Sequence, residues 1–149
     1  WTGSLRGGAE WREYDNRGRK TAPYFEFALN HQASDRTFFR WYGRWGNDAN
    51  ELGTYTEHLA FRTGFTANHR FTKDFSGNAG VHYVHSEFSG SPISQDYDED
   101  LLALSLGVNY QIWRNVGLGA PYYYTTIDSG NPFREYDRHR FTIGVNATF

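Results

Sequence analysis

Apolar and polar residues alternate along the last twelve residues of the chain, positions 138–149. Every second side chain there is apolar or aromatic, in the order Phe141, Ile143, Val145, Ala147 and Phe149. The positions between them hold Arg140, Thr142, Gly144, Asn146 and Thr148. A period of two is typical of a β-strand with one apolar and one polar face. The pattern therefore predicts an amphipathic strand at 138–149.

The same period recurs through the rest of the chain, between segments rich in turn residues. It predicts eight strands, at 4–14, 22–32, 36–46, 56–72, 78–89, 101–113, 116–127 and 138–149. The connections between them would hold 7, 3, 9, 5, 11, 2 and 10 residues, so long and short connections alternate. This alternation is typical of an antiparallel up-and-down barrel with short turns at one end and long loops at the other. An even number of strands would place both termini at the end with short turns.

The predicted strand 101–113 shows the clearest separation of faces. One face holds Leu102, Leu104, Leu106, Val108, Tyr110 and Ile112, and the other holds Ala103, Ser105, Gly107, Asn109 and Gln111. The apolar faces of the other strands carry large side chains, among them Leu5, Trp11, Phe25, Phe27, Leu29, Phe39, Trp41, Trp45, Leu59, Phe61, Phe65, Val81 and Tyr83. The opposite faces combine glycines and arginines, which suit the crowded interior of a narrow eight-stranded barrel. We therefore expect the aromatic faces to lie outside, against lipid. The alternative, a soluble lipocalin-like barrel with the faces reversed, would force these aromatics into that interior.

The composition also departs from that of an ordinary soluble domain. Aromatic residues make up 19% of the chain, and only Lys20 and Lys73 of the 15 basic residues are lysines. Water-exposed surfaces normally carry more Lys, so these biases favour a membrane barrel. No apolar run approaches the ~18 residues of a transmembrane helix.

The net charge and the absence of cysteine exclude further classes of function. The formal charge is -2, and a nucleic-acid partner would need a basic excess. Without Cys the chain has neither disulfides nor thiolate metal sites, and we expect no cofactor. Because the chain opens on Trp1 and contains no Met, we expect a processed or excised product whose export signal is not included.

Large aromatics would also gather near the strand ends, as in the interfacial girdles of membrane barrels. Trp11, Trp41, Trp45, Tyr122 and Tyr124 would lie toward the outer ends, and Trp113 toward the inner ends. In these features the chain resembles the small outer-membrane β-barrels of Gram-negative bacteria, the OmpA/OmpX-like class. Its segment 138–149 is also similar to the closing strand of larger outer-membrane porins. Pro121, in the middle of a predicted strand, departs from the pattern because it removes a ladder hydrogen bond, so it requires either a bulge or a different register.

The resemblance implies one all-β domain over 1–149, an eight-stranded antiparallel up-and-down transmembrane β-barrel with short periplasmic turns and long extracellular loops. It implies a location in the bacterial outer membrane, with both termini periplasmic. The expected partners are outer-membrane lipid, lipopolysaccharide and the barrel-assembly machinery. That machinery would recognise Phe149 as the assembly signal.

Charged residues of the polar faces would meet in the lumen. The predicted network comprises Arg6, Glu10, Arg12, Glu26, Arg40, Arg44, Arg62 and Arg140. One interpretation is a plug of ion pairs, because buried charges need partners and eight strands leave little free lumen. The other is a narrow path for anions, because inward Arg outnumber Glu and interior arginines favour anions. A plug of ion pairs does not account for the excess of inward Arg over inward Glu.

Two further clusters were candidates for chemistry. Asp96, Asp98 and Asp100 resemble the start of a calcium-binding loop, but Leu101 and Gly107 occupy the positions where such a loop needs Gly and Glu. We therefore interpret them as a solvated acidic loop, with weak cation binding as the alternative. Barrels that modify lipid A use His, Ser and a carboxylate, which the segment 82–87 contains. Its His85 and Ser86 would face opposite sides of a strand, so we expect no enzyme.

The predicted function is a non-enzymatic outer-membrane scaffold with a largely plugged, Arg-rich lumen. Its loops, at 15–21, 47–55, 90–100 and 128–137, would bind a protein partner or the cell surface. The alternative is a narrow anion-preferring pore, or the closing segment of a larger porin.

Overall fold

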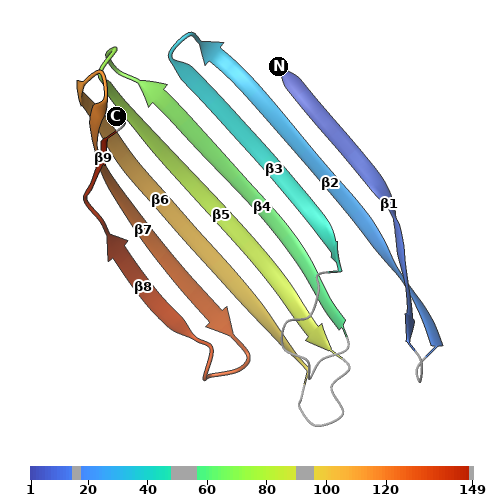
Figure 1. Cartoon of the computed structure of the whole chain (residues 1–149). Coiled ribbons are helices and arrows are strands. Elements are labelled where there is room, and N and C mark those ends of the chain that lie inside the picture. Colours follow the sequence, from blue (N-terminus) through green and yellow to red (C-terminus); the bar gives the residue numbers. More distant parts are fainter. Residues whose placement is uncertain (15–17, 48–56, 90–95, 148–149) are drawn as a thin grey trace.

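The computed structural model describes residues 1–14, 18–47, 57–89 and 96–147. Within these ranges, the chain forms nine strands: β1 (Thr2–Tyr14), β2 (Gly18–Ser34), β3 (Thr37–Asn47), β4 (Glu57–Arg70), β5 (Phe75–Ser89), β6 (Tyr97–Trp113), β7 (Val116–Ser129), β8 (Tyr136–Phe141) and β9 (Gly144–Ala147). They make one antiparallel sheet in chain order, and β9 pairs with β7 alongside β8 (Figure 1). The predicted all-β, antiparallel up-and-down architecture is confirmed.

Several strands extend further toward the loop end than the sequence indicated. Parts of the four predicted loops belong to strands in the structure, namely residues 18–21, 47, 97–100, 128–129 and 136–137. These segments are polar, but the backbone groups of each hairpin can pair outside an apolar belt as well as inside it. The predicted loop boundaries were therefore wrong at these positions. Residues 15–17, 48–56 and 90–95 of the predicted loops lie outside the described residues.

The predicted last strand, 138–149, is interrupted opposite Pro121. Tyr122 pairs with Phe141 and Gly119 pairs with Gly144, so β8 and β9 keep one register across the interruption. The amide of Thr142 donates to the Pro121 carbonyl at 3.0 Å. Proline has no N–H to return the second bond of that pair, so the ladder breaks there. The sheet thus accommodates Pro121 through this break, without a bulge or a change of register between β7 and the last two strands. The expectation of a continuous strand at 138–149 was wrong.

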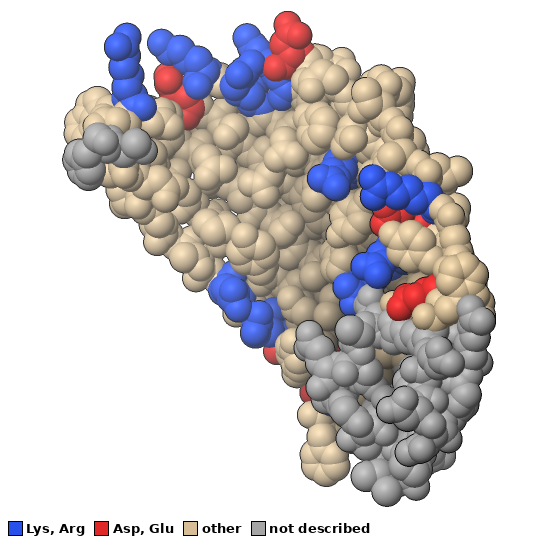
Figure 2. All heavy atoms as spheres, turned by 45° about the vertical axis from the view of Figure 1, so that its right-hand side comes forward, with Lys and Arg blue, Asp and Glu red and all other residues tan. Residues whose placement is uncertain are grey.

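The two faces of the sheet differ in chemistry. Phe61, Leu106 and Ile143 lie on one face, where they are 40%, 57% and 69% exposed. We call this the apolar face. The opposite, arginine face carries Arg6 and Arg44 among others and contains the buried Ala60, Phe88 and Ile127. Side chains on this face crowd together more closely, which places it on the hollowed side of the sheet, and Figure 2 shows basic side chains within that hollow.

The sheet is open in the described residues, where β1 pairs only with β2, and β8 and β9 only with β7. The predicted closure of the eighth strand onto the first does not occur among these residues. The connections 35–36, 71–74 and 114–115 lie at one end of the sheet, where β1 begins and β9 ends (Figure 1). In the described ranges, no helix is long and apolar enough to cross a membrane.

Candidate functional site

Four charged residues form a row across neighbouring strands on the arginine face. Arg6 of β1 pairs with Glu26 of β2, Glu26 pairs with Arg44 of β3, and Arg44 pairs with Arg62 of β4. Directly paired residues of an antiparallel sheet project from the same face. We call Arg6, Glu26, Arg44 and Arg62 the arginine row.

Glu26 is held by two neighbours. Nη1 of Arg6 donates to its Oε1 atom at 2.8 Å, and the hydroxyl of Tyr24 donates to its Oε2 atom. Tyr24 lies two residues from Glu26 on the same strand, so their side chains share a face. Both carboxylate oxygens of Glu26 therefore already have a donor.

The arginines of β3 lie over tyrosine rings. The guanidinium carbon of Arg44 is 5.5 Å from the ring centroid of Tyr24, and that of Arg40 is 5.9 Å from the ring centroid of Tyr42. Contacts of this kind are attractive and orient the cation along the face. They orient the two guanidinium groups over the arginine face of the sheet.

A hollow of about 440 Å³ lies over this part of the sheet. Its lining includes Arg6, Glu26, Arg40, Arg44, Arg62 and His82. Tyr42 also lines it, and its hydroxyl is hydrogen-bonded to Nδ1 of His82 at 2.7 Å. Four arginines and one glutamate give this hollow an excess of positive charge. Because guanidinium groups bind carboxylate and phosphate through paired N–H donors, the arrangement suits an anion.

The structure brings together part of the predicted lumen network. Arg6, Glu26, Arg40, Arg44 and Arg62 meet around the hollow. Glu10 lies further along β1, opposite Ala22. Arg140 lies on β8 opposite Tyr123, at the other edge of the sheet, and is not part of the row. Arg12 lies on β1, and its side chain is outside the described side chains.

Sequence reasoning missed the aromatic members of the site. Tyr24, Tyr42 and His82 connect the charged residues through the contacts above. A signal was available for two of them, because Tyr24 and Tyr42 alternate in phase with Glu26 and Arg44 on their strands. No sequence pattern indicated that His82 would reach Tyr42 from two strands away.

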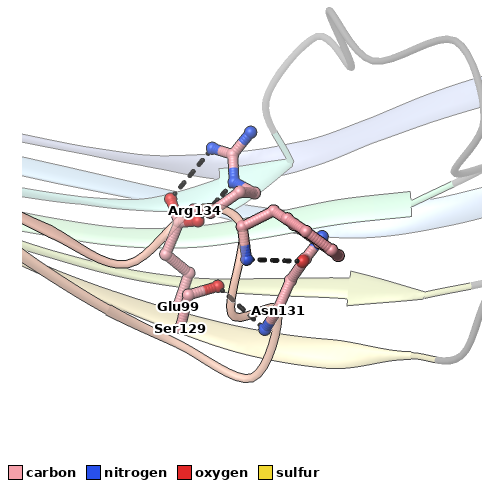
Figure 3. Close-up of polar contacts among 5 residues, drawn as sticks. Glu99, Ser129, Asn131 and Arg134 are labelled. Atoms are coloured by element: carbon pink, nitrogen blue, oxygen red, sulfur yellow. Dashed lines mark hydrogen bonds and ion pairs between the residues drawn. The ribbon is translucent and has the colours of Figure 1, made fainter.

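A second polar cluster joins the β7–β8 connection to the arginine face (Figure 3). Arg134 donates to both carboxylate oxygens of Glu99, through Nε at 2.6 Å and Nη2 at 3.1 Å. Glu99 is 8% exposed, and the hydrogen bond to it raises the pKa of Arg134 above its ordinary value. The Arg134 guanidinium also lies 5.8 Å from the ring centroid of Phe88. This pair fixes the connection to the sheet, and no pattern in the sequence predicted it.

Within that connection, local hydrogen bonds shape the turn. The amide of Asn131 donates to Oγ of Ser129 at 3.2 Å, and the amide of Phe133 donates to Oδ1 of Asn131 at 3.2 Å (Figure 3). Such side-chain bonds to nearby amides are typical of Ser and Asn in turns. They present Arg134 toward Glu99.

The acidic residues predicted as a loop are partly in a strand. Asp98 and Asp100 belong to β6, where they pair with Glu87 and His85. Asp100 accepts a hydrogen bond from the Tyr83 hydroxyl at 2.6 Å and contacts Nδ1 of His85 at 2.8 Å. Acidic residues at alternate positions are also what one face of a strand produces. The prediction of an acidic loop was therefore wrong for Asp98 and Asp100, whereas Asp96 precedes the strand. Across the described part of the chain, no three His, Cys, Asp or Glu side chains are grouped as metal ligands would be.

His85 and Ser86 project from opposite faces. Ser86 is 6% exposed and pairs with Ala60 and Glu99 on the arginine face. His85 contacts Asp100 on the apolar face, and its Nε2 atom is 3.7 Å from Glu87. These two residues therefore form no nucleophile–base pair.

The predicted aromatic girdle is only partly at the strand ends. Trp11 and Trp45 lie toward the loop end, and Trp113 lies at the turn end, all three exposed. Trp41, Tyr122 and Tyr124 lie nearer the middle of their strands, so their predicted position at the outer ends was wrong. The two tyrosines bind polar partners on β8, at 2.9 Å to His139 and 3.0 Å to Asp137. Phe149, the predicted assembly signal, lies outside the described residues.

No curated protein and no solved structure matches the chain. A family model described as "Putative beta-barrel porin 2" matches residues 4–149. The match supports the porin part of the resemblance and not the OmpA/OmpX class specifically. Because the match covers nearly the whole sequence, the chain belongs to this family of β-barrel porins.

Proposed function

We propose that the chain forms the wall of an outer-membrane pore whose arginine row favours the passage of anionic solutes. The observation that carries the proposal is the hollow on the arginine face, where four arginines accompany one glutamate. Membership of a porin family supports a barrel that carries solutes. The proposal assigns the chain no enzymatic step.

The exposed apolar face supports a membrane location. Exposing so many large apolar side chains to water, among them Phe61 and Leu106, costs free energy, and contact with lipid removes that cost. A sheet in lipid must also pair its edges, because an unpaired backbone group there costs several kcal/mol. The edges at β1 and at β8 and β9 therefore pair in the membrane, with each other or with further strands. In either closure the apolar face meets lipid and the arginine face lines the lumen.

The preference for anions follows from how the charges are distributed. Arg6 and Tyr24 already bind Glu26, so its carboxylate is occupied by donors. Against the single negative charge of Glu26, the four arginines of the hollow, Arg6, Arg40, Arg44 and Arg62, give the lumen wall its positive potential. Rings of cationic side chains favour anions in pores.

Planar-bilayer recordings across a KCl gradient test this proposal. We expect unitary currents with a reversal potential on the anion-selective side. The double variant R44Q/R62Q should shift that potential toward zero, because it removes two cations without removing the hollow. The matched control R44K/R62K keeps both charges and should keep the selectivity. Cation selectivity of the wild type would contradict the proposal.

A plugged scaffold is the second candidate, and the Arg134–Glu99 pair favours it. This pair holds the β7–β8 connection against the arginine face, as a plug or a platform for a partner would require. A scaffold of this kind would bind a protein partner through its outer connections. The same recordings separate the two candidates, because a plugged barrel gives no reproducible unitary current.

A further inference from the structure

A second basic hollow lies at the end of the sheet with short turns. Its volume is about 430 Å³, and its charged lining residues are Arg70, Lys73, Arg114 and Asp74. Figure 2 shows basic side chains gathered along this end of the sheet. Three cations and one carboxylate again leave an excess of positive charge.

The same hollow is rich in side-chain amides. Asn109 and Gln111 of β6 and Asn146 of β9 contribute to its lining. Gln111 uses its Nε2 atom to donate to the carbonyl of Trp113 at 2.6 Å, which fixes the side chain and leaves its oxygen as an acceptor. Cations beside amides can bind both the charged and the hydroxyl or ester oxygens of one solute.

The two hollows lie on one face and are joined by regularly spaced arginines. Arg70 is four residues along β4 from Thr66, which pairs with Arg40, and Arg40 is four residues along β3 from Arg44. At about 3.3 Å per residue each step is ~13 Å, and the distance along β4 from Arg70 to Arg62 is ~26 Å. We call Arg70, Arg40, Arg44 and Arg62 the arginine ladder. Its length is close to the ~25 Å height of the apolar band of a membrane barrel.

We propose that the arginine ladder and its two hollows bind a linear oligoanion, a chain-like solute that carries carboxylate or phosphate groups along its length. This inference rests on the proposed function, because the ladder must line a lumen. A single small anion can occupy only one hollow at a time. An oligoanion occupies both, and the second contact then forms within the complex at high effective concentration. The cations repeat along the strands, so successive anionic groups of such a solute can each contact an arginine.

Binding to the full chain, folded in detergent, tests the proposal by isothermal titration calorimetry. The probes are galacturonate, an oligogalacturonate long enough to span ~26 Å, and a linear oligophosphate of equal length. We expect each oligoanion to bind at least ~100-fold more tightly than galacturonate or inorganic phosphate, respectively. A gain with only one of the two oligoanions identifies which anionic group the ladder prefers. Equal affinity of oligomer and monomer for both chemistries would overturn the proposal.

Variants of the two hollows make the test specific. R70Q/R114Q alters the hollow at the turns, and R44Q/R62Q alters the arginine row. Each should reduce oligoanion binding to about the monomer affinity, while monomer binding at the unaltered hollow persists. The controls R70K/R114K and R44K/R62K should retain most of the gain. Unchanged oligoanion affinity in either Gln variant would also overturn the proposal.

Two outcomes separate this inference from the proposed function. An anion-selective pore that binds monomer and oligomer equally would overturn the ladder and leave the pore intact. Tight oligoanion binding without unitary current would overturn the pore and leave the binding site intact. If a Gln variant does not fold, the salt dependence of the wild type decides instead. Oligoanion binding should weaken more steeply with salt than monomer binding, because more ion pairs form. Equal slopes would overturn the proposal.

Discussion

Arg44 and Arg62 are direct cross-strand partners, so two cations face each other on the same side of adjacent strands. Like charges in this position normally destabilise a sheet. Glu26, on the other side of Arg44, is bound by Arg6 and Tyr24. The pair therefore combines a cost in stability with a position in the anion site proposed above.

The first prediction concerns that cost. Arg62→Gln should raise the free energy of unfolding by ~0.2–1 kcal/mol at low ionic strength, because it removes a like-charge contact. The gain should diminish as salt is added, since screening weakens the repulsion in the wild type. Urea unfolding in detergent at two salt concentrations measures both effects. A loss of stability that does not depend on salt would contradict the prediction.

The second prediction concerns Glu26. Glu26→Gln should strengthen anion selectivity, because it removes the carboxylate that Arg6 and Tyr24 bind and frees the charge of Arg6. The reversal potential in a KCl gradient measures the shift. Glu10→Gln is the matched control, since Glu10 lies on β1 opposite Ala22 and outside the arginine row. An equal shift in both variants would mean that the row has no special role.

The third prediction concerns the interruption of the last strand. Pro121→Ala should supply the N–H that the carbonyl of Thr142 lacks and join β8 to β9. One added ladder bond should raise the free energy of unfolding by ~0.5–1.5 kcal/mol. Part of this gain is lost, because alanine gives the unfolded chain more conformational entropy than proline does. Hydrogen exchange is the more direct measurement, because the new amide of residue 121 should exchange slowly. Fast exchange at that amide would show that β8 and β9 stay separate for another reason.

The fourth prediction concerns the pair in Figure 3. Arg134→Gln should lower the free energy of unfolding by ~1–3 kcal/mol, because Glu99 is buried and loses its charged donor. The estimate is below that for a fully buried ion pair, since the Arg134 side chain is 36% exposed. Faster proteolytic cleavage within 130–135 should accompany the loss. The double variant R134Q/E99Q should recover part of the stability, and no recovery would argue against direct coupling.

The fifth prediction compares the two faces at adjacent residues of β6. In a phospholipid bilayer, Leu106→Arg should cost ~2–4 kcal/mol, because it places a cation against lipid. Ser105→Arg, on the arginine face, should cost less because its charge can reach the lumen. Reversible unfolding from bilayers measures both values. The reverse order would show that the apolar face does not meet lipid.

Much of the fold follows from local pattern. Alternation in segments such as 101–113 was enough to place the strands and assign their faces, because side chains of a strand have a fixed period. The ends of strands were less predictable. Residues 97–100 are polar and read as a loop, yet they pair with β5 because a hairpin can continue beyond its apolar part. The interruption at 142–143 depends on Pro121 in another strand, which alternation within 138–149 does not reveal.

The candidate site was predictable only in part, for the same reason. The face of Arg40, Arg44 and Arg62 follows from the period of each strand. Which of them are neighbours depends on register between strands, which pattern along one strand leaves open. Glu99 and Arg134 are 35 residues apart in the chain, and their contact requires both the sheet and the turn after β7. Long-range pairing, rather than residue type, was the missing information.

The interruption at Thr142 also bears on how the wall is completed. β8 and β9 attach to β7 as two short pieces, with no register offset between them. Because only residues 142 and 143 separate the two pieces and both keep one register, pairing of either piece with β7 places the other in alignment. The last edge of the sheet can thus form in two short pairing steps instead of one.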